Sequence, residues 1–281
     1  MIRLSRSPDP VSFRYHRGSR DYQEDSFGIL TRGNRLLLGI SDGMGGHSSG
    51  ELASRWLIEN LHRAFQKDLD IGPLIRETLN MTQEKIQSSG KDMGCTAVMV
   101  LIEREENRHQ VSYTWIGDSR VYVFSGSGLR PPGNARKIGS RDNRVLWLIT
   151  EDDSFVWGFL SSNELSLDDL TLHPNKNQLE LSIHSNRPDI AVIAEKRIRS
   201  LTLHSRDRLL LCTDGVWETF VHQEEIISIL SHPDPAKKMN EHLKRTQRED
   251  LLRDNNTCII STLGEEIYSV KNWINKKKVK P

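Results

Sequence analysis

Residues 39–47 read GISDGMGGH, an apolar run that ends on Asp42 and is followed at once by glycines. Four other aspartates stand at predicted strand ends, and three of the five follow or end an apolar run and are flanked by Gly or small residues. The four are Asp25 in QEDSFG, Asp118 in WIGDSR, Asp214 in LLLCTDGVWE and Asp254 in RDNNTCII. We expect tight turns to project these carboxylates from the ends of several strands that converge in space.

Four or five ionised carboxylates cannot pack together without positive charge, because each one raises the pKa of the others and destabilises the fold. Bound divalent ions would remove that conflict. The candidate ligands are all oxygen atoms, with no His or Cys at ligand spacing, so the pattern favours magnesium or manganese over zinc.

The composition is that of an ordinary soluble globule, with 281 residues, 36% hydrophobic and 27% charged. The formal net charge of +1 provides no global field that would attract nucleic acid or an anionic membrane. The chain has neither a signal-type apolar segment nor a run of membrane-spanning length. Cys95, Cys212 and Cys258 lie in or beside apolar runs without a C-x-x-C pair, which indicates reduced thiols and a cytoplasmic protein.

The first half of the chain is predicted to form strands and then two helices. Short runs rich in β-branched or aromatic residues predict strands at 11–16, 25–30, 35–41, 95–102, 109–117 and 119–125. Turn signals between neighbouring strands favour antiparallel hairpins over βαβ units. Apolar residues at helical spacing predict one helix around 52–65 and a second around 74–86.

The second half begins with PPGNARKIGSRDNR (131–144), which we interpret as a loop. Strands are expected at 146–150, 190–195, 198–204 and 207–213, helices at 222–231 and 235–249, and a last strand at 257–261. Strands and helices in separate blocks predict an α+β fold with antiparallel sheets in a single domain. We place that domain at 1–262 and a basic C-terminal tail at 263–281.

Six motifs occur in one order: GSRDYQEDS, DGMGGHSSGELAS, GCTAV, GDSRVY, LLLCTDGVWE and DNNT. Together, over residues 18–261, they resemble the metal-dependent serine/threonine protein phosphatases of the type 2C family, in particular its bacterial-type members. The resemblance implies a sandwich of two antiparallel β-sheets flanked by pairs of α-helices. It also implies hydrolysis of phosphoserine and phosphothreonine monoesters on proteins, by a water activated between two Mn²⁺ or Mg²⁺ ions.

The resemblance carries specific roles onto residues of this chain. Asp25, Asp42, Asp214 and Asp254, with the backbone carbonyl of Gly43, match the positions that hold the central pair of ions. Asp118, together with Asp214, matches the position that holds a third and weaker ion, so two or three ions are expected. Arg20 matches the arginine that grips the substrate phosphate, a duty that suits the planar fork of a guanidinium. Arg20 and Asp42 are therefore the expected catalytic residues.

The chain departs from the family pattern in two places. Met44 stands where eukaryotic members have a proposed acid, a histidine, and a thioether donates no proton. His47 could serve instead, or could only cap or pack at a helix start, and solvent is a further source of the proton. The second departure is a flap at 151–188, where we expect Asp152, Asp153, Asp168 and Asp169 to form a solvated acidic face rather than to bind metal.

Two other functions compete with phosphatase activity. A catalytically silent relative would bind phosphoprotein or a regulatory ligand, but should have lost the metal-binding acids. A metal-dependent phosphodiesterase or nuclease would need a basic, aromatic groove, which the near-neutral charge disfavours. We expect a monomer whose partner is a phosphorylated protein, such as a Ser/Thr kinase or its target, without nucleic acid or membrane.

Overall fold

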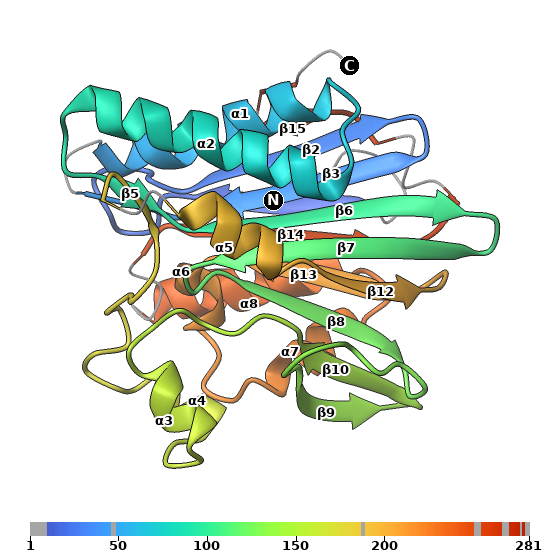
Figure 1. Ribbon diagram of the computed structural model, residues 1–281. Helices are drawn as coiled ribbons and strands as arrows, with labels where there is room; N and C mark the ends of the chain where they lie inside the picture. The colour runs from blue at the N-terminus through green and yellow to red at the C-terminus, as the bar shows by residue number, and fades with distance from the viewer. Residues whose placement is uncertain are drawn as a thin grey trace.

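The fold consists of two large antiparallel sheets packed face to face between layers of helices (Figure 1). The computed structural model describes residues 10–45, 49–186, 189–249, 254–265, 270–275 and 277–278. The predicted α+β sandwich of antiparallel sheets flanked by helices is confirmed. His47, the candidate proton donor, lies outside the described residues.

The first large sheet has six strands in the order β1-β14-β13-β8-β10-β9. Their bounds are β1 Val11–His16, β14 Asn256–Thr262, β13 Arg208–Cys212, β8 Arg120–Gly126, β10 Arg144–Leu148 and β9 Arg136–Arg141.

The second large sheet has seven strands in the order β12-β7-β6-β3-β2-β15-β16. Their bounds are β12 Arg199–Leu203, β7 Arg108–Ile116, β6 Ala97–Glu105, β3 Arg35–Ser41, β2 Ser26–Arg32, β15 Trp273–Ile274 and β16 Lys277–Lys278. A small third sheet joins β11 (Ile183–His184), β5 (Gly94–Cys95) and β4 (Gly43–Met44).

The helices lie on the outer faces of the two large sheets. Those on the seven-stranded sheet are α1 (Ser49–Phe65), α2 (Ile71–Ser89) and α5 (Ile190–Lys196). Those on the six-stranded sheet are α6 (Asp214–Trp217), α7 (Glu225–Leu230) and α8 (Pro235–Arg248), with α3 (Trp157–Ser161) and α4 (Leu167–Leu170) from the flap. Within the described ranges, every helix is too short or too polar to cross a lipid bilayer.

Successive side chains of a strand point to opposite faces of its sheet, which divides the core into one inner layer between the sheets and two outer layers under the helices. In β3, Leu36 and Leu38 face the layer between the sheets, whereas Leu37 faces α1 and α2. Burying each such leucine contributes about 1.5–3 kcal/mol. Gly39 allows α1 to pack closely, because a Cβ at this position would lie 2.6 Å from a methyl group of Leu61. The strand ends therefore stand on a closely packed core.

The prediction of a strand at 190–195 is wrong, because these residues form α5. Ile190, Ala191 and Ala194 are buried at helical spacing, and α5 packs against α2. Thr114 of β7 also donates a hydrogen bond to the carbonyl of Ala194, at 2.6 Å. The β-branched residues of this segment suggested a strand, but burial of one helical face outweighs that preference.

Two further predictions of the second half are wrong. The expected loop at 131–144 contains β9, an edge strand whose charged residues hide the strand signal. The strand at 257–261 is not the last, since β15 pairs with β2 and Trp273 packs against the inner core. Part of the segment after residue 262 thus extends the seven-stranded sheet.

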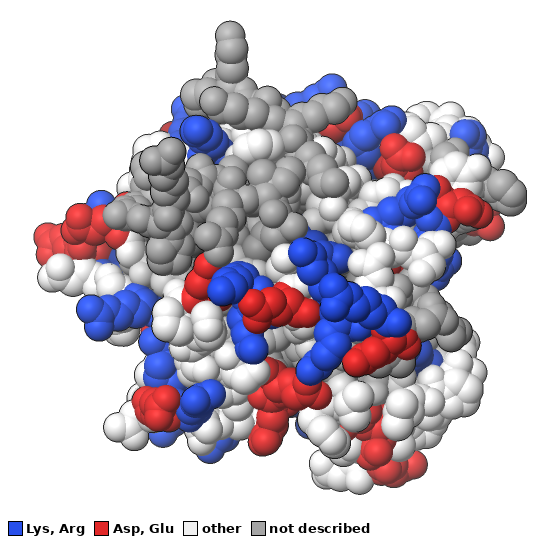
Figure 2. Space-filling view, turned by 180° about the vertical axis from the view of Figure 1, so that it is seen from behind, with Lys and Arg blue, Asp and Glu red and all other residues white. Residues whose placement is uncertain are grey.

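Basic and acidic side chains are mixed on the surface. On the face opposite to that of Figure 1, blue and red side chains alternate without forming one large field of either sign (Figure 2). On α8, for example, Glu241 lies 4.0 Å from Lys237 and 3.7 Å from Lys238. This distribution agrees with the near-zero net charge.

Candidate active site

The predicted acids converge at one end of the sandwich. Asp42 and Asp214 follow the last residues of β3 and β13, while Asp25 and Asp254 precede β2 and β14 and Asp118 precedes β8. In an antiparallel pair, the first residue of one strand lies opposite the last residue of its neighbour. Ser26 of β2 lies opposite Ser41 of β3, and Arg120 of β8 lies opposite Cys212 of β13. The two sheets meet here, because Thr213 Oγ1 donates a hydrogen bond to Asp25 at 3.1 Å.

A pocket of about 310 Å³ opens at this end, and most of the predicted site residues line it. Its lining comprises Arg20, Glu24, Asp42, Gly43, Met44, Gly45, Thr96, Asp118, Asn177, Leu179, Asp214, Asp254 and Asn255. Asp25 is fully buried beside the pocket, and its charge acts on the carboxyl of Asp42, which lines it. The structure therefore brings all the predicted site residues together.

Glycine is required at the turn that carries Asp42. A Cβ on Gly43 would lie 2.1 Å from the carbonyl oxygen of Gly50 and 2.6 Å from that of Glu24, which leaves no space for a side chain. Thr96 fixes the neighbouring aspartate, since its Oγ1 accepts from the Asp42 amide at 2.9 Å and its own amide donates to the Asp42 carbonyl at 2.8 Å. The close approach of α1 to this turn therefore depends on the glycine.

The acids raise one another's pKa values. Burial raises the pKa of Asp25 to about 7, and the charge of Asp254 adds to that shift. Burial, and then the charges of Asp214 and Asp25, hold the pKa of Asp42 well above its usual range. Burial, and then Asp118, do the same for Asp214. Such shifts indicate a site that needs added positive charge before all its carboxylates ionise.

The donor set fits a hard divalent cation. All its ligand atoms would be oxygens, and Oδ1 of Asp25 is buried without a well-formed hydrogen bond among the described residues. In the described part of the chain, no three His, Cys, Asp or Glu side chains form a ready-made cage for an ion. Mg²⁺ does not require one, because it usually takes one or two carboxylates and keeps several waters.

Arg20 is held at the mouth of the pocket. Its Nη2 lies 2.6 Å from Oδ2 of Asp254, while 56% of its side chain remains exposed. The guanidinium thus stands beside the acid cluster, and its other donors make no hydrogen bond to the residues that the structure describes. Met44 also lines the pocket, and its thioether provides no acid there.

Asn255 also lines the pocket, although its residue type and spacing did not predict a role there. Its Oδ1 accepts from the amide of Glu24 at 2.6 Å, and its Nδ2 donates to the carbonyls of Arg17 and Tyr22 at 2.8 and 2.9 Å. Asn255 thereby fastens the segment that carries Arg20 to the strand end that carries Asp254. Its place directly after Asp254 in DNNT was the only signal in the sequence.

The prediction of a solvated acidic face in the flap is wrong for Asp152 and Asp153. Asp152 is buried against Arg120, and Asp153 accepts from Arg197 at 2.7 Å and from the amide of Gly117 at 2.9 Å. These three partners are all distant in the sequence, so a run of acids alone could not reveal them.

The other two flap acids lie nearer the surface. Asp169 is exposed in the first turn of α4, where it forms a capping box with Ser166. Asp168 is partly buried and accepts a hydrogen bond from the amide of Gln223 at 2.9 Å. The flap also contributes Lys176, which forms an ion pair with Glu218 directly after α6.

Known proteins with similar sequences and folds are phosphatases. A sequence model described as protein phosphatase 2C matches residues 14–254. The serine/threonine phosphatase stp of Listeria monocytogenes is 28% identical over 234 residues, 78% of this chain and 82% of that protein. The protein phosphatase PhpP of Streptococcus pneumoniae is 27% identical over 251 residues, 84% of this chain and 89% of that protein.

A solved structure of the catalytic domain of the serine/threonine protein phosphatase PstP, in complex with two manganese ions, has a similar fold. The TM-score is 0.65 at 21% sequence identity, and the likeness covers 91% of this chain and 98% of that one.

Proposed function

This chain belongs to the protein phosphatase 2C family and is a metal-dependent phosphatase of phosphoserine and phosphothreonine in proteins, and we propose that the pocket at the end of its sandwich is the active site. The observation that carries this proposal is the convergence of four aspartates and one arginine on a single pocket, with a fifth aspartate, Asp25, buried beside them.

The proposed ligands of the central pair of ions are Asp25, Asp42, Asp214, Asp254 and the carbonyl of Gly43. Asp118 and Asp214 would share a third ion. Bound Mn²⁺ or Mg²⁺ supplies a water activated for in-line attack on phosphorus and neutralises charge on the phosphoryl oxygens. The acids supply fixed negative charge on a rigid frame, so that the ions need little reorganisation when substrate arrives.

Arg20 would orient the substrate. Its fork of donors matches two phosphoryl oxygens, and its contact with Asp254 fixes the fork beside the acid cluster. A phosphate held there is presented to the metal-binding acids rather than to solvent, which is the positioning that phosphoryl transfer depends on. Protonation of the leaving seryl or threonyl oxygen does not come from residue 44, because Met44 has no acidic proton.

The flap would influence which phosphoproteins are accepted. Asn177 and Leu179 of this segment line the pocket. We propose that the substrate is a phosphorylated Ser/Thr kinase or a target of one, and that the enzyme acts as a monomer in the cytoplasm. The three cysteines support a reducing compartment, since all of them are free and buried.

The test is hydrolysis of a phosphothreonine peptide by the purified protein with Mn²⁺, before and after chelation. We expect turnover that stops when the metal is removed. Asp42→Asn should lower kcat by about a hundredfold or more with the fold intact, because it removes a charge that acts on the transition state. The matched control is Asp142→Asn, a carboxylate that is 85% exposed. Wild-type rates in Asp42→Asn would remove this residue from the site.

A further inference from the structure

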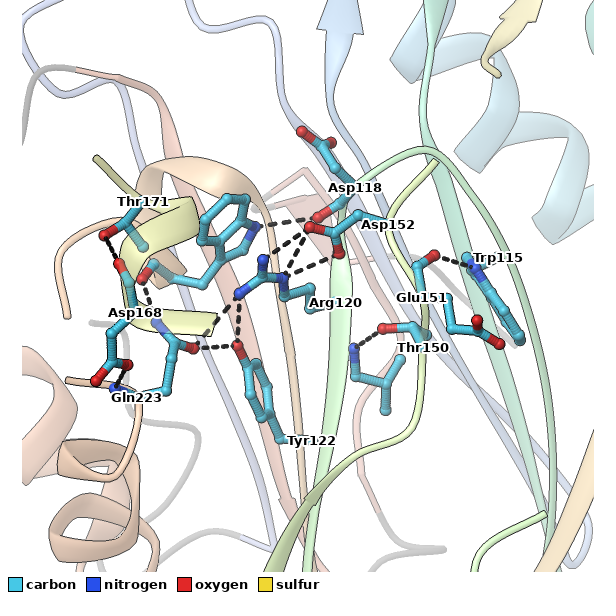
Figure 3. Close-up of polar contacts among 12 residues, drawn as sticks. Trp115, Asp118, Arg120, Tyr122, Thr150, Glu151, Asp152, Asp168, Thr171 and Gln223 are labelled. Atoms are coloured by element: carbon cyan, nitrogen blue, oxygen red, sulfur yellow. Dashed lines mark hydrogen bonds and ion pairs between the residues drawn. The ribbon is translucent and has the colours of Figure 1, made fainter. Parts of the chain in front are cut away.

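A buried polar network lies next to the pocket, around Arg120 at the start of β8 (Figure 3). The side chains of Arg120 and Asp152 are 0% and 1% exposed. Nε of Arg120 donates to Oδ1 of Asp152 at 3.0 Å, and Nη2 donates to Oδ2 at 2.7 Å. This two-pronged contact leaves the guanidinium a single orientation.

The guanidinium also holds Trp217. It stacks on the indole ring with its central carbon 3.6 Å from the ring centroid. Its remaining nitrogen, Nη1, lies 3.3 Å from the hydroxyl of Tyr122, which in turn donates to Gln223 at 2.5 Å. Nε2 of Gln223 donates to the carbonyl of Trp217 at 3.1 Å. The ring and the main chain of Trp217 are thus held from two sides.

Trp217 links two of the proposed metal-binding acids. Its indole Nε1 donates a hydrogen bond to the carbonyl oxygen of Asp118 at 3.0 Å. The same residue ends α6, the single helical turn that begins at Asp214. One fully packed side chain, 1% exposed, therefore sets the position of the Asp118 main chain relative to Asp214.

We infer that Trp217, clamped by Arg120 and Gln223, is a positioning residue that fixes Asp118 against Asp214 and so sets the divalent-ion affinity of the site that these two acids share. The inference rests on the proposed function, which assigns that site. A buried ion pair such as Arg120–Asp152 adds little stability over apolar side chains of similar volume. Its use here is geometric, since a guanidinium alone combines a fixed fork with a flat face for the indole.

Trp217→Phe removes the N–H donor and keeps an aromatic ring under the guanidinium, although the smaller ring also loses volume, which a second Trp→Phe variant must control for. The matched control is Trp157→Phe, since Nε1 of Trp157 has no hydrogen-bond partner among the described residues. Binding of Mn²⁺ to metal-free protein is followed without substrate, by the electron paramagnetic resonance signal of free Mn²⁺. We expect Trp217→Phe to weaken the weakest class of sites about tenfold, and Trp157→Phe to bind as the wild type does.

A double-mutant cycle tests whether the effect passes through Asp118. If it does, Asp118→Asn combined with Trp217→Phe should bind Mn²⁺ no more weakly than Asp118→Asn alone. Three results would overturn the inference: a Trp217→Phe isotherm that coincides with the wild type, effects of the two substitutions that add in full, or an Asp118→Asn isotherm equal to the wild type.

Removing the ion pair as a whole separates positioning from stability. Arg120→Met with Asp152→Leu should unfold near the wild-type temperature, because both charges leave together. We still expect it to bind Mn²⁺ about tenfold more weakly at the weakest sites. If Trp217→Phe does not fold, the double variant replaces it in the test. Mn²⁺ binding equal to that of the wild type would then refute the inference. These isotherms require no turnover, so a failure of the proposed function would appear separately, as a wild-type protein that binds Mn²⁺ without hydrolysing phosphopeptide.

Discussion

Asp25→Asn should stabilise the metal-free protein while it abolishes activity. Asp25 is fully buried, and its burial, together with the charge of Asp254, raises its pKa from 3.8 to about 7. The ionised carboxylate is therefore unfavourable in the folded state unless a cation lies beside it. An amide of the same shape can still accept the hydrogen bond from Thr213 and carries no charge.

The size of the effect follows from the pKa shift. A shift from 3.8 to about 7 corresponds to about 4 kcal/mol of destabilisation once the group is ionised in both states. In the variant, the side-chain group at the position of Oδ1 has no hydrogen-bond partner among the described residues, and burying it unpaired costs about 1–3 kcal/mol. We therefore expect the variant to gain about 1–3 kcal/mol of unfolding free energy above pH 7, in chelator.

The pH dependence has a definite sign. A carboxyl whose pKa is higher in the folded state makes its full contribution to the unfolding free energy below its pKa in the unfolded chain. That contribution is lost as the pH rises through the pKa of the folded state. In chelator, Asp25 should thus make the unfolding free energy of the wild type fall by at most about 1.4 kcal/mol per pH unit, and by about 2 kcal/mol in total, between pH 5 and 7. The slope should be smaller in Asp25→Asn, and saturating Mn²⁺ should remove the variant's advantage over the wild type.

The assay is urea denaturation in chelator at pH 5, 6, 7 and 8, repeated with Mn²⁺. Asp142→Asn is the matched control and should stay within about 0.5 kcal/mol of the wild type, because that side chain is exposed. An Asp25→Asn protein that is less stable than the wild type at pH 8 in chelator would refute the reasoning, since it would mean that the carboxylate is not under repulsion.

Three further substitutions test other parts of the account. Arg20→Ala should raise the KM for a phosphopeptide about tenfold with a smaller change in kcat. An unchanged KM would show that Arg20 does not contact the substrate phosphate. Gly43→Ala should lower the unfolding free energy by about 3 kcal/mol or more, because its Cβ would lie 2.1 Å from a backbone oxygen. Gly126→Ala, with nothing within 4 Å, should cost less than about 1 kcal/mol, and equal losses in the two variants would contradict this explanation. Lys176→Gln removes the cation from Glu218 and should speed amide exchange at 175–180, whereas unchanged exchange would show that the pair does not hold the flap.

The candidate active site could be predicted from the sequence because its signals are local. Three of the five predicted acids follow or end an apolar run and are flanked by Gly or small residues, so the sequence shows both the strand end and the turn, as in GISDGMGGH around Asp42. The seven-residue run 35–41 and the six-residue run 11–16 were predicted with the bounds that the structure has. Convergence of the acids then followed from antiparallel pairing.

What could not be predicted depends on partners distant in the sequence. Asp152 looks like one acid in a polar run, and only the fold reveals that Arg120 covers it. The helix α5 carries β-branched residues typical of strands, and its burial against α2 decides its structure. The strand β9 is polar because it lies at a sheet edge, so its composition resembles that of a loop.

The central claim is that the converged aspartates hold divalent ions. The most direct test is anomalous diffraction at the manganese edge from crystals of the wild-type protein grown with Mn²⁺. The account predicts at least two strong peaks about 2.0–2.6 Å from carboxylate oxygens of Asp42 and Asp214. Crystals in millimolar Mn²⁺ that contain no such peak between these two side chains would contradict it.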